Sequence, residues 1–187
     1  MNRSKYIIGL AVIVIIVAIG ISIKSVDSQN DMVERGKYIV DAVAACGFCH
    51  TPRTGTEYNE DMYLAGHVAN SPYSRYDMSL MQRGIFLASP ATLTAFSGPF
   101  GSSFATNLTP DKETGLGEWT EDMFIKALRT GHHQGNVDNR KIFPPMPWKH
   151  YAQMNDSDLK AIWAYLRTIK PVKNEVSPVL NPMGRPY

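Results

Sequence analysis

The stretch Ala44-Ala45-Cys46-Gly47-Phe48-Cys49-His50 contains both cysteines of the 187-residue chain, followed at once by a histidine. The pattern C-x-x-C-H is typical of a covalent attachment site for c-type haem. On one helical turn the three side chains share a face, so two thiols can form thioethers with the haem vinyl groups while the imidazole lies beneath the ring. The stretch therefore predicts one haem c, held by Cys46 and Cys49, with His50 as the proximal iron ligand.

Two other kinds of site use such a pair of cysteines. A zinc site needs about four ligands, usually with a second Cys or His pair at a defined spacing, and the chain has no third cysteine. The redox dithiol of a thioredoxin-like protein follows a β-strand, whereas a helical pattern precedes Cys46. A thiol-disulfide oxidoreductase that uses Cys46 and Cys49 is thus the main alternative to haem attachment.

Residues 1–30 are predicted to form a membrane anchor and a polar tether. Arg3 and Lys5 precede an uncharged run at residues 6–23, which as a helix would reach about 27 Å, close to the thickness of a bilayer's hydrocarbon core. No clear small-x-small cleavage site follows, so we expect a single transmembrane helix, with a cleavable signal peptide as the alternative. The positive charges before the run predict a cytoplasmic N-terminus, and both alternatives export the remainder of the chain.

The charge of the exported part, residues 31–187, is balanced. The formal net charge of +2 arises from Arg3, Lys5 and Lys24 against Asp27. The exported part has no basic stripe, so nucleic-acid binding is excluded as a function.

Helical periodicity predicts a domain of a few helices, with one long loop at 51–106 and an irregular tail at 174–187. The first helix begins at Asp31 and delivers the cysteines, and Gly36 within it marks either a close helix crossing or a tolerated surface glycine. Further helices are expected at 76–86, from an N-cap at Thr120 to Gly131, and from an N-cap at Asn155 to Pro171.

The chain resembles class I cytochromes c, and most nearly the single-haem domains of cytochrome c subunits of bacterial membrane-bound dehydrogenases. The resemblance covers residues 31 to about 173 and is carried by Gly36-Lys37-Tyr38, Cys46 to Arg53, Tyr63-Leu64-Ala65-Gly66, Asn107 to Asp111, Gly115 to Trp119, Pro145-Met146-Pro147 and Ala164 to Arg167. It implies an all-α fold around one haem, with the first and last helices crossing. Many such subunits carry two or three C-x-x-C-H motifs, whereas this chain has one.

Met146 is the predicted sixth iron ligand among nine methionines. Three prolines stiffen the loop Phe143-Pro144-Pro145-Met146-Pro147, and Met146 matches the Met-Pro ligand position of the family that the chain resembles. The rival ligands are histidines that we expect at the surface or at helix caps: His67, His132, His133 and His150.

The resemblance also implies residues around the haem. In cytochromes of this kind a proline carbonyl accepts a hydrogen bond from the proximal histidine, and Pro99 is the candidate here. Asn107 and Trp119 are expected to line the propionate edge, with an ordinary turn and a core tryptophan as the alternatives.

These features predict an electron carrier rather than an enzyme, because no nucleophile–base pair and no glycine-rich phosphate loop are recognisable. We expect a single-pass protein of the bacterial inner membrane with its haem domain on the periplasmic side. It would take one electron from a dehydrogenase or quinol-oxidising complex and pass it to another cytochrome or a terminal oxidase. A haem-based sensor or gas-binding module is the alternative, and it would need an open sixth position.

Overall fold

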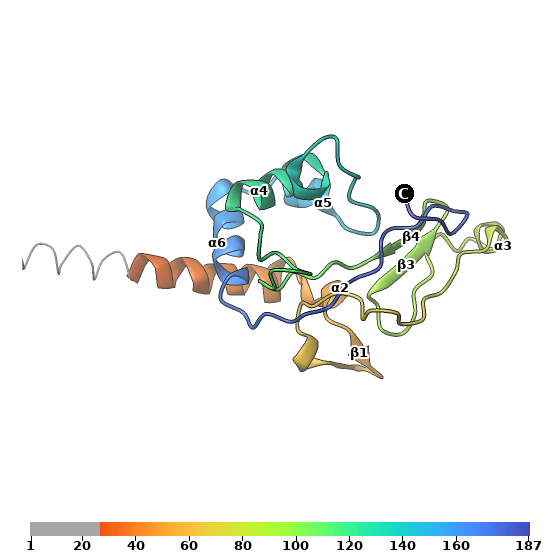
Figure 1. Ribbon diagram of the computed structural model, residues 1–187, viewed down its shortest axis with the longest axis horizontal. Coiled ribbons are helices and arrows are strands. Elements are labelled where there is room, and N and C mark those ends of the chain that lie inside the picture. Colours follow the sequence, from red (N-terminus) through yellow and green to blue (C-terminus); the bar gives the residue numbers. More distant parts are fainter. Residues whose placement is uncertain (1–26) are drawn as a thin grey trace, which may run out of the picture.

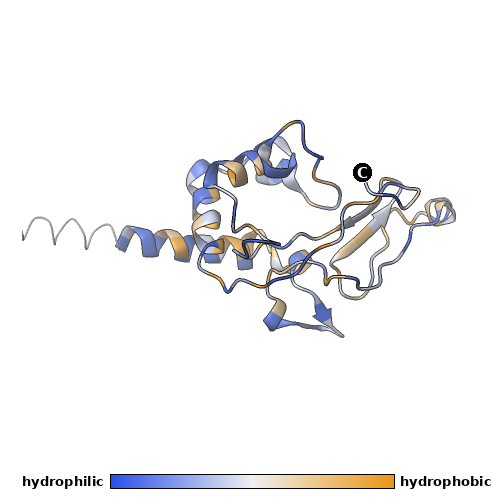
Figure 2. Cartoon of the chain, in the orientation of Figure 1, coloured by the Kyte–Doolittle hydropathy of each residue, from blue (hydrophilic) through white to orange (hydrophobic). Residues whose placement is uncertain are grey.

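A helix covers residues 27–38 and continues directly into η1, a π-helical turn at Ile39–Val43. The computed structural model describes residues 27–187. Ala45 has a φ of +48°, and after this turn the chain enters α2 (Gly47–His50). Figure 1 shows the first helix in orange entering the domain from the left and running towards α2, and it carries both hydrophilic and hydrophobic residues (Figure 2). The predicted delivery of the cysteines by the first helix is confirmed.

The remaining long helices carry the predicted caps. Thr120 Oγ1 accepts a hydrogen bond from the Met123 N–H at 3.2 Å at the start of α4 (Glu121–Thr130), and Gly131, with a φ of +71°, ends that helix. Asn155 caps α6 (Asp156–Leu166) in the same way. Short helices complete the set: η2 (Glu60–Met62), α3 (Met78–Gln82), η3 (His133–Gly135) and α5 (Trp148–Tyr151).

Two antiparallel hairpins show that the predicted all-α class is wrong. β1 (Arg53–Thr54) pairs with β2 (Glu57–Tyr58), and β3 (Ala95–Gly98) pairs with β4 (Gly101–Phe104). Every residue of β3 and β4 is buried. A strand that is buried on both faces lacks the alternation of polar and apolar residues that marks a half-exposed strand, so periodicity could not reveal this hairpin inside the expected loop.

The predicted membrane-spanning helix at residues 6–23 lies outside the described residues. Within residues 27–187, no helix combines the length and the hydrophobicity needed to cross a bilayer. The described domain is therefore helical with two small hairpins, and the prediction of an all-α protein with one transmembrane helix does not hold for it.

The hydrophobic core lies where the first helix, α4 and α6 meet. Its buried members include Ile39, Val40, Leu64, Phe124, Leu128, Leu159, Ile162 and Leu166. Figure 1 shows α4 and α5 as one layer, with the β3–β4 hairpin extending to the side away from the first helix. The tail at 174–187 has no helix or strand, but the backbone of Leu180 pairs with Ser102 of β4, so it is fastened to the hairpin.

Candidate cofactor site

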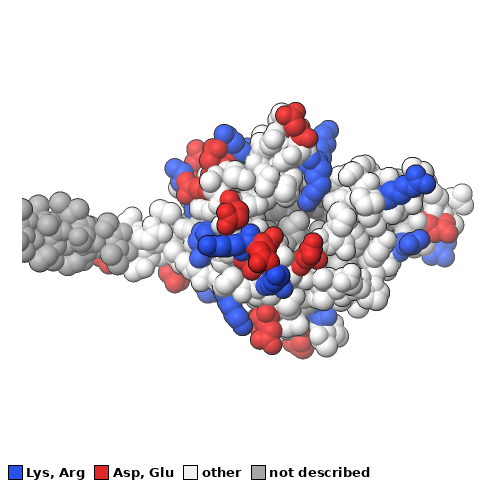
Figure 3. Space-filling view, in the orientation of Figure 1, with Lys and Arg blue, Asp and Glu red and all other residues white. Residues whose placement is uncertain are grey.

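A cavity of about 650 Å³ lies between the α4–α5 layer and the rest of the domain. Cys46, Cys49 and His50 line it from the motif, and Met146 lines it from the proline-rich loop. Much of the remaining wall is apolar and includes Phe96, Phe104, Leu128, Ile162 and Leu166. Figure 3 shows the drawn face hollowed beneath the α4–α5 layer, with acidic and basic side chains interspersed over the surface around it.

His50 is fixed and neutral. Its side chain is 8% exposed, and Nδ1 lies 2.7 Å from the carbonyl oxygen of Thr106. The Nδ1–H therefore donates a hydrogen bond to that carbonyl, which leaves Nε2 as the ring nitrogen with a free lone pair. Burial lowers the pKa of His50, and the hydrogen bond to Thr106 opposes this only in part. A neutral imidazole whose other nitrogen is held by an acceptor is the usual form of a histidine that ligates a metal.

The two thiols are poorly suited to redox exchange. Burial raises the pKa of Cys46 to about 12, and burial also raises the pKa of Cys49, opposed by the charge of Arg53. Thiol-disulfide exchange requires a thiolate, which reactive dithiols obtain through a lowered pKa. No group of three His, Cys, Asp or Glu side chains within residues 27–187 could hold a metal ion. Both alternatives to haem attachment are thereby weakened.

Met146 is half-buried and is held by backbone contacts at a turn. Its N–H donates to the Phe143 carbonyl at 3.2 Å, and the Ser103 hydroxyl donates to the Pro144 carbonyl at 2.6 Å. β4 and the proline-rich loop are thus tied together. The thioether of Met146 belongs to the same cavity wall as the motif residues.

Asn107 and Trp119 also line the cavity. The amide of Asn107 donates to the Val172 carbonyl at 2.8 Å and to Thr114 Oγ1 at 3.1 Å, and its oxygen accepts from Thr109. Because these bonds use every hydrogen of the amide, Asn107 braces the wall and offers no free donor to a ligand. Trp119 packs edge-on against His133, with ring centroids 5.1 Å apart.

The predicted role of Pro99 is wrong. Thr106 supplies the carbonyl that accepts the hydrogen bond from His50, and Pro99 is absent from the cavity wall. Gly98 pairs with Gly101 across the end of the β3–β4 hairpin, so Pro99 occupies the hairpin turn. The length of β4 therefore separates Pro99 from Thr106, which follows that strand.

Three of the four rival histidines lie outside the cavity wall. His67 is buried and its Nδ1 lies 2.9 Å from Thr94 Oγ1, His132 contacts the Thr130 carbonyl at 3.1 Å, and His150 is exposed. Only His133 lines the cavity. Met146 is thus accompanied by one histidine on the wall besides His50.

Sequence reasoning missed two residues at this site, Thr106 and Arg140. Thr106 acts through its backbone carbonyl, which any residue type could supply, so no signal in the sequence marks it. Arg140 lines the wall from the loop after α4, and His133, which was named as a rival ligand but expected at the surface or at a helix cap, lines it as well. For Arg140 the sequence offered one signal, a cationic side chain in the polar stretch that precedes the proline-rich loop.

No family model matches the chain. It is 30% identical over 146 residues to the fructose dehydrogenase cytochrome subunit of Gluconobacter japonicus, covering 78% of this chain and 23% of that protein. It is 30% identical over 148 residues to the gluconate 2-dehydrogenase cytochrome c subunit of Pantoea cypripedii, covering 78% and 25%. It is 28% identical over 147 residues to the cytochrome c subunit of the alcohol dehydrogenase (quinone) of Gluconobacter oxydans, covering 78% and 23%.

The matched region thus spans a quarter or less of these curated relatives, but most of the present chain. Most of this chain is similar to cytochrome c subunits of dehydrogenases, which supports a cytochrome c domain and implies haem c as its cofactor. The apolar cavity, with two thiols and a fixed imidazole on its wall, fits that cofactor.

Proposed function

We propose that this chain is a class I, single-haem cytochrome c domain that carries one electron at a time and transforms no substrate itself. The observation that carries the proposal is the convergence of Cys46, Cys49, His50 and Met146 on one apolar cavity. When bound there, haem c supplies a one-electron couple at its iron, and the polypeptide sets the potential of that couple.

Each of the four residues has a distinct role in the proposal. Cys46, the N-cap of α2, and Cys49 within α2 would form the thioether links. His50 would offer Nε2 to the iron, because Nδ1 is engaged with the Thr106 carbonyl. Met146 would offer its thioether to the iron, and the hydrogen bond between Ser103 and the Pro144 carbonyl helps to hold its loop in place.

Arg140 is our candidate partner for the haem propionates. Arg140 lines the cavity, and burial lowers its pKa. Among residues 27–187 no carboxylate forms an ion pair with it. A half-buried guanidinium favours a carboxylate partner, and the haem propionates would provide two.

The relatives are named as cytochrome subunits of dehydrogenases, which suggests the kind of redox partner. We propose that a dehydrogenase or quinol-oxidising complex delivers the electrons and that another cytochrome or a terminal oxidase receives them. We also propose that the domain works on the periplasmic side of a bacterial inner membrane. Support for this comes from the uncharged run at residues 6–23, preceded by Arg3 and Lys5.

Haem staining after denaturing, reducing electrophoresis tests the proposal, because thioether links survive both treatments. We expect the stain to follow the wild-type polypeptide and to be lost when Cys46→Ser and Cys49→Ser are combined. The control is Ser157→Ala on α6, away from the cavity, which should keep the stain. Extraction of all haem from the wild type by acidified acetone would refute covalent attachment.

A further inference from the structure

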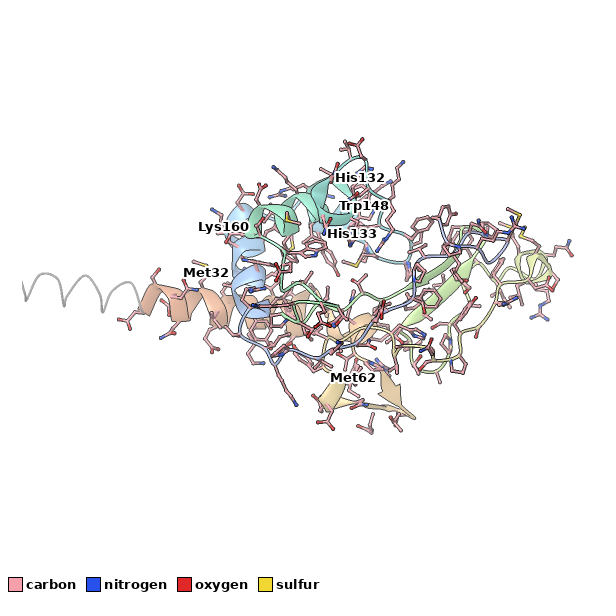
Figure 4. All side chains as sticks on the ribbon, in the orientation of Figure 1. Met32, Met62, His132, His133, Trp148 and Lys160 are labelled. Carbon is pink, nitrogen blue, oxygen red and sulfur yellow. The ribbon has the colours of Figure 1, made fainter. Side chains whose placement is uncertain are left out.

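His133 and Arg140 are neighbours at the two ends of the loop that follows α4. The His133 N–H donates to the Arg140 carbonyl at 2.9 Å, and both side chains line the cavity. The imidazole is further placed by Trp119, whose ring it meets edge-on at 90°. In Figure 4 His133 lies on the side of the α4–α5 layer that faces the rest of the domain, whereas His132 lies further out. A titratable ring is therefore built into the wall of the redox site.

The surroundings hold this ring neutral. Burial lowers the pKa of His133, and the positive charge of Arg140 lowers it further. The other ionisable groups near it are Lys126 of α4, which lies against Gly135, Lys141 beside Arg140, His132 before it in the chain, and Glu113 and Glu175 elsewhere on the cavity wall. Lys173 already forms an ion pair with Glu113.

We propose that His133 is a proton-uptake site coupled to electron uptake in the cavity, an inference that rests on the proposed binding of haem c there. When an external one-electron donor, such as a reduced cofactor of a dehydrogenase, adds one electron to the site, His133 binds one proton from water. When the electron leaves to an acceptor, His133 returns the proton. One electron and one proton enter and leave together, so the net charge of the cavity stays constant.

The sign of the effect follows from electrostatics. An added electron makes the cavity more negative, so it stabilises the imidazolium and raises the pKa of His133 in the reduced protein. Between the two pKa values the reduction potential must fall as pH rises, by at most about 59 mV for each tenfold drop in proton concentration. Because the pKa of His133 is already below the ordinary 6.5 of histidine, we expect the fall in reduction potential to begin below pH 6.5.

Arg140 should set where that fall occurs. Its positive charge opposes protonation of the nearby His133 ring. Removing it with Arg140→Gln would therefore raise both pKa values of His133 and move the sloping region to higher pH, whereas Arg140→Lys, which keeps the charge, would leave the region closer to its original position.

Spectroelectrochemical titration of the purified haem-loaded protein from about pH 4.5 to 9 tests the proposal. We expect a sloping region in the wild type and in His132→Gln, a matched control because His132 is the preceding residue and lies off the cavity wall. The slope should vanish in His133→Gln. In parallel, NMR titration of the wild type should give a higher pKa for His133 in the reduced than in the oxidised state.

Two results would overturn the inference: equal pKa values of His133 in both oxidation states, or a slope that persists in His133→Gln. The NMR comparison needs no variant, so it decides the question even if His133→Gln does not fold. Failure of the proposed function is a separate result, because the same samples would then show no covalently attached haem.

Discussion

Gly36 lies directly against the carbonyl of Ala161, where the first helix crosses α6. A Cβ atom at Gly36 would come within 1.9 Å of that oxygen and 2.8 Å of the Tyr165 Cβ. The two helices that carry this contact also bear core residues such as Ile39 and Leu159. The crossing therefore sets the distance between α6 and the helix that delivers the cysteines.

We predict that Gly36→Ala destabilises the protein by about 2 kcal/mol, because the helices must separate, although alanine is the better helix former. The matched control is Glu34→Ala, on an exposed position of the same helix, which should change stability little. Urea denaturation of both variants measures the difference. A Gly36→Ala variant as stable as Glu34→Ala would show that the crossing yields without cost.

Asn107 should be a larger contributor to stability than its position in a turn suggests. It is 3% exposed and joins the cavity wall to the chain after α6 through Val172. Asn107→Ala leaves the Thr109 N–H without its side-chain acceptor, and we expect a loss of about 1–3 kcal/mol. Asn136→Ala removes a similar turn bond at an exposed position, to the Asp138 N–H, and should cost clearly less in the same denaturation experiment.

His67 should make the protein sensitive to acid. Burial lowers its pKa below the ordinary 6.5, so the unfolded chain binds a proton more readily than the folded one. Stability contributed by the neutral ring is therefore present above about pH 6.5 and is lost as the pH falls towards the folded-state pKa. His67→Gln should flatten the decline in unfolding free energy below pH 6.5, and His150→Gln, at an exposed site, should leave it unchanged. An identical acid profile in all three proteins would contradict this role.

The four residues proposed to hold haem c could be picked out from the sequence. Cys46, Cys49, His50 and Met146 belong to short patterns, and the cavity wall brings together all four. The caps at Thr120 and Asn155 were equally accessible, because a helix N-terminus needs an acceptor at a fixed position.

Features that depend on backbone placement could not be identified in this way. The acceptor for His50 is a carbonyl, so the residue type at Thr106 carries no information about it. The β3–β4 hairpin is buried throughout and has no polar face to give it a period. Pro99 was favoured by resemblance to a family pattern, but the pairing of Gly98 with Gly101 makes it a turn residue.

Met146 gives the sharpest test of axial ligation. A thioether ligand stabilises the reduced iron relative to a second imidazole and so raises the potential. Met146→Ala should lower the reduction potential on the order of 0.1 V, within the range of about 0.8 V that axial ligands control. The weak near-infrared band of sulfur-ligated oxidised haem should disappear as well, while haem staining shows that the cofactor remains attached.

Met183→Ala is the matched control for that experiment. Met183 is 76% exposed in the tail, so its loss should change neither the band nor the potential. Met146→His should also lower the potential while the iron remains six-coordinate and low-spin, since imidazole is a strong ligand in place of sulfur. If Met146→Ala keeps both the band and the potential of the wild type, another residue occupies the sixth position. Because His133 is the one rival histidine on the cavity wall, His133→Gln would then be the variant to examine for loss of six-coordination.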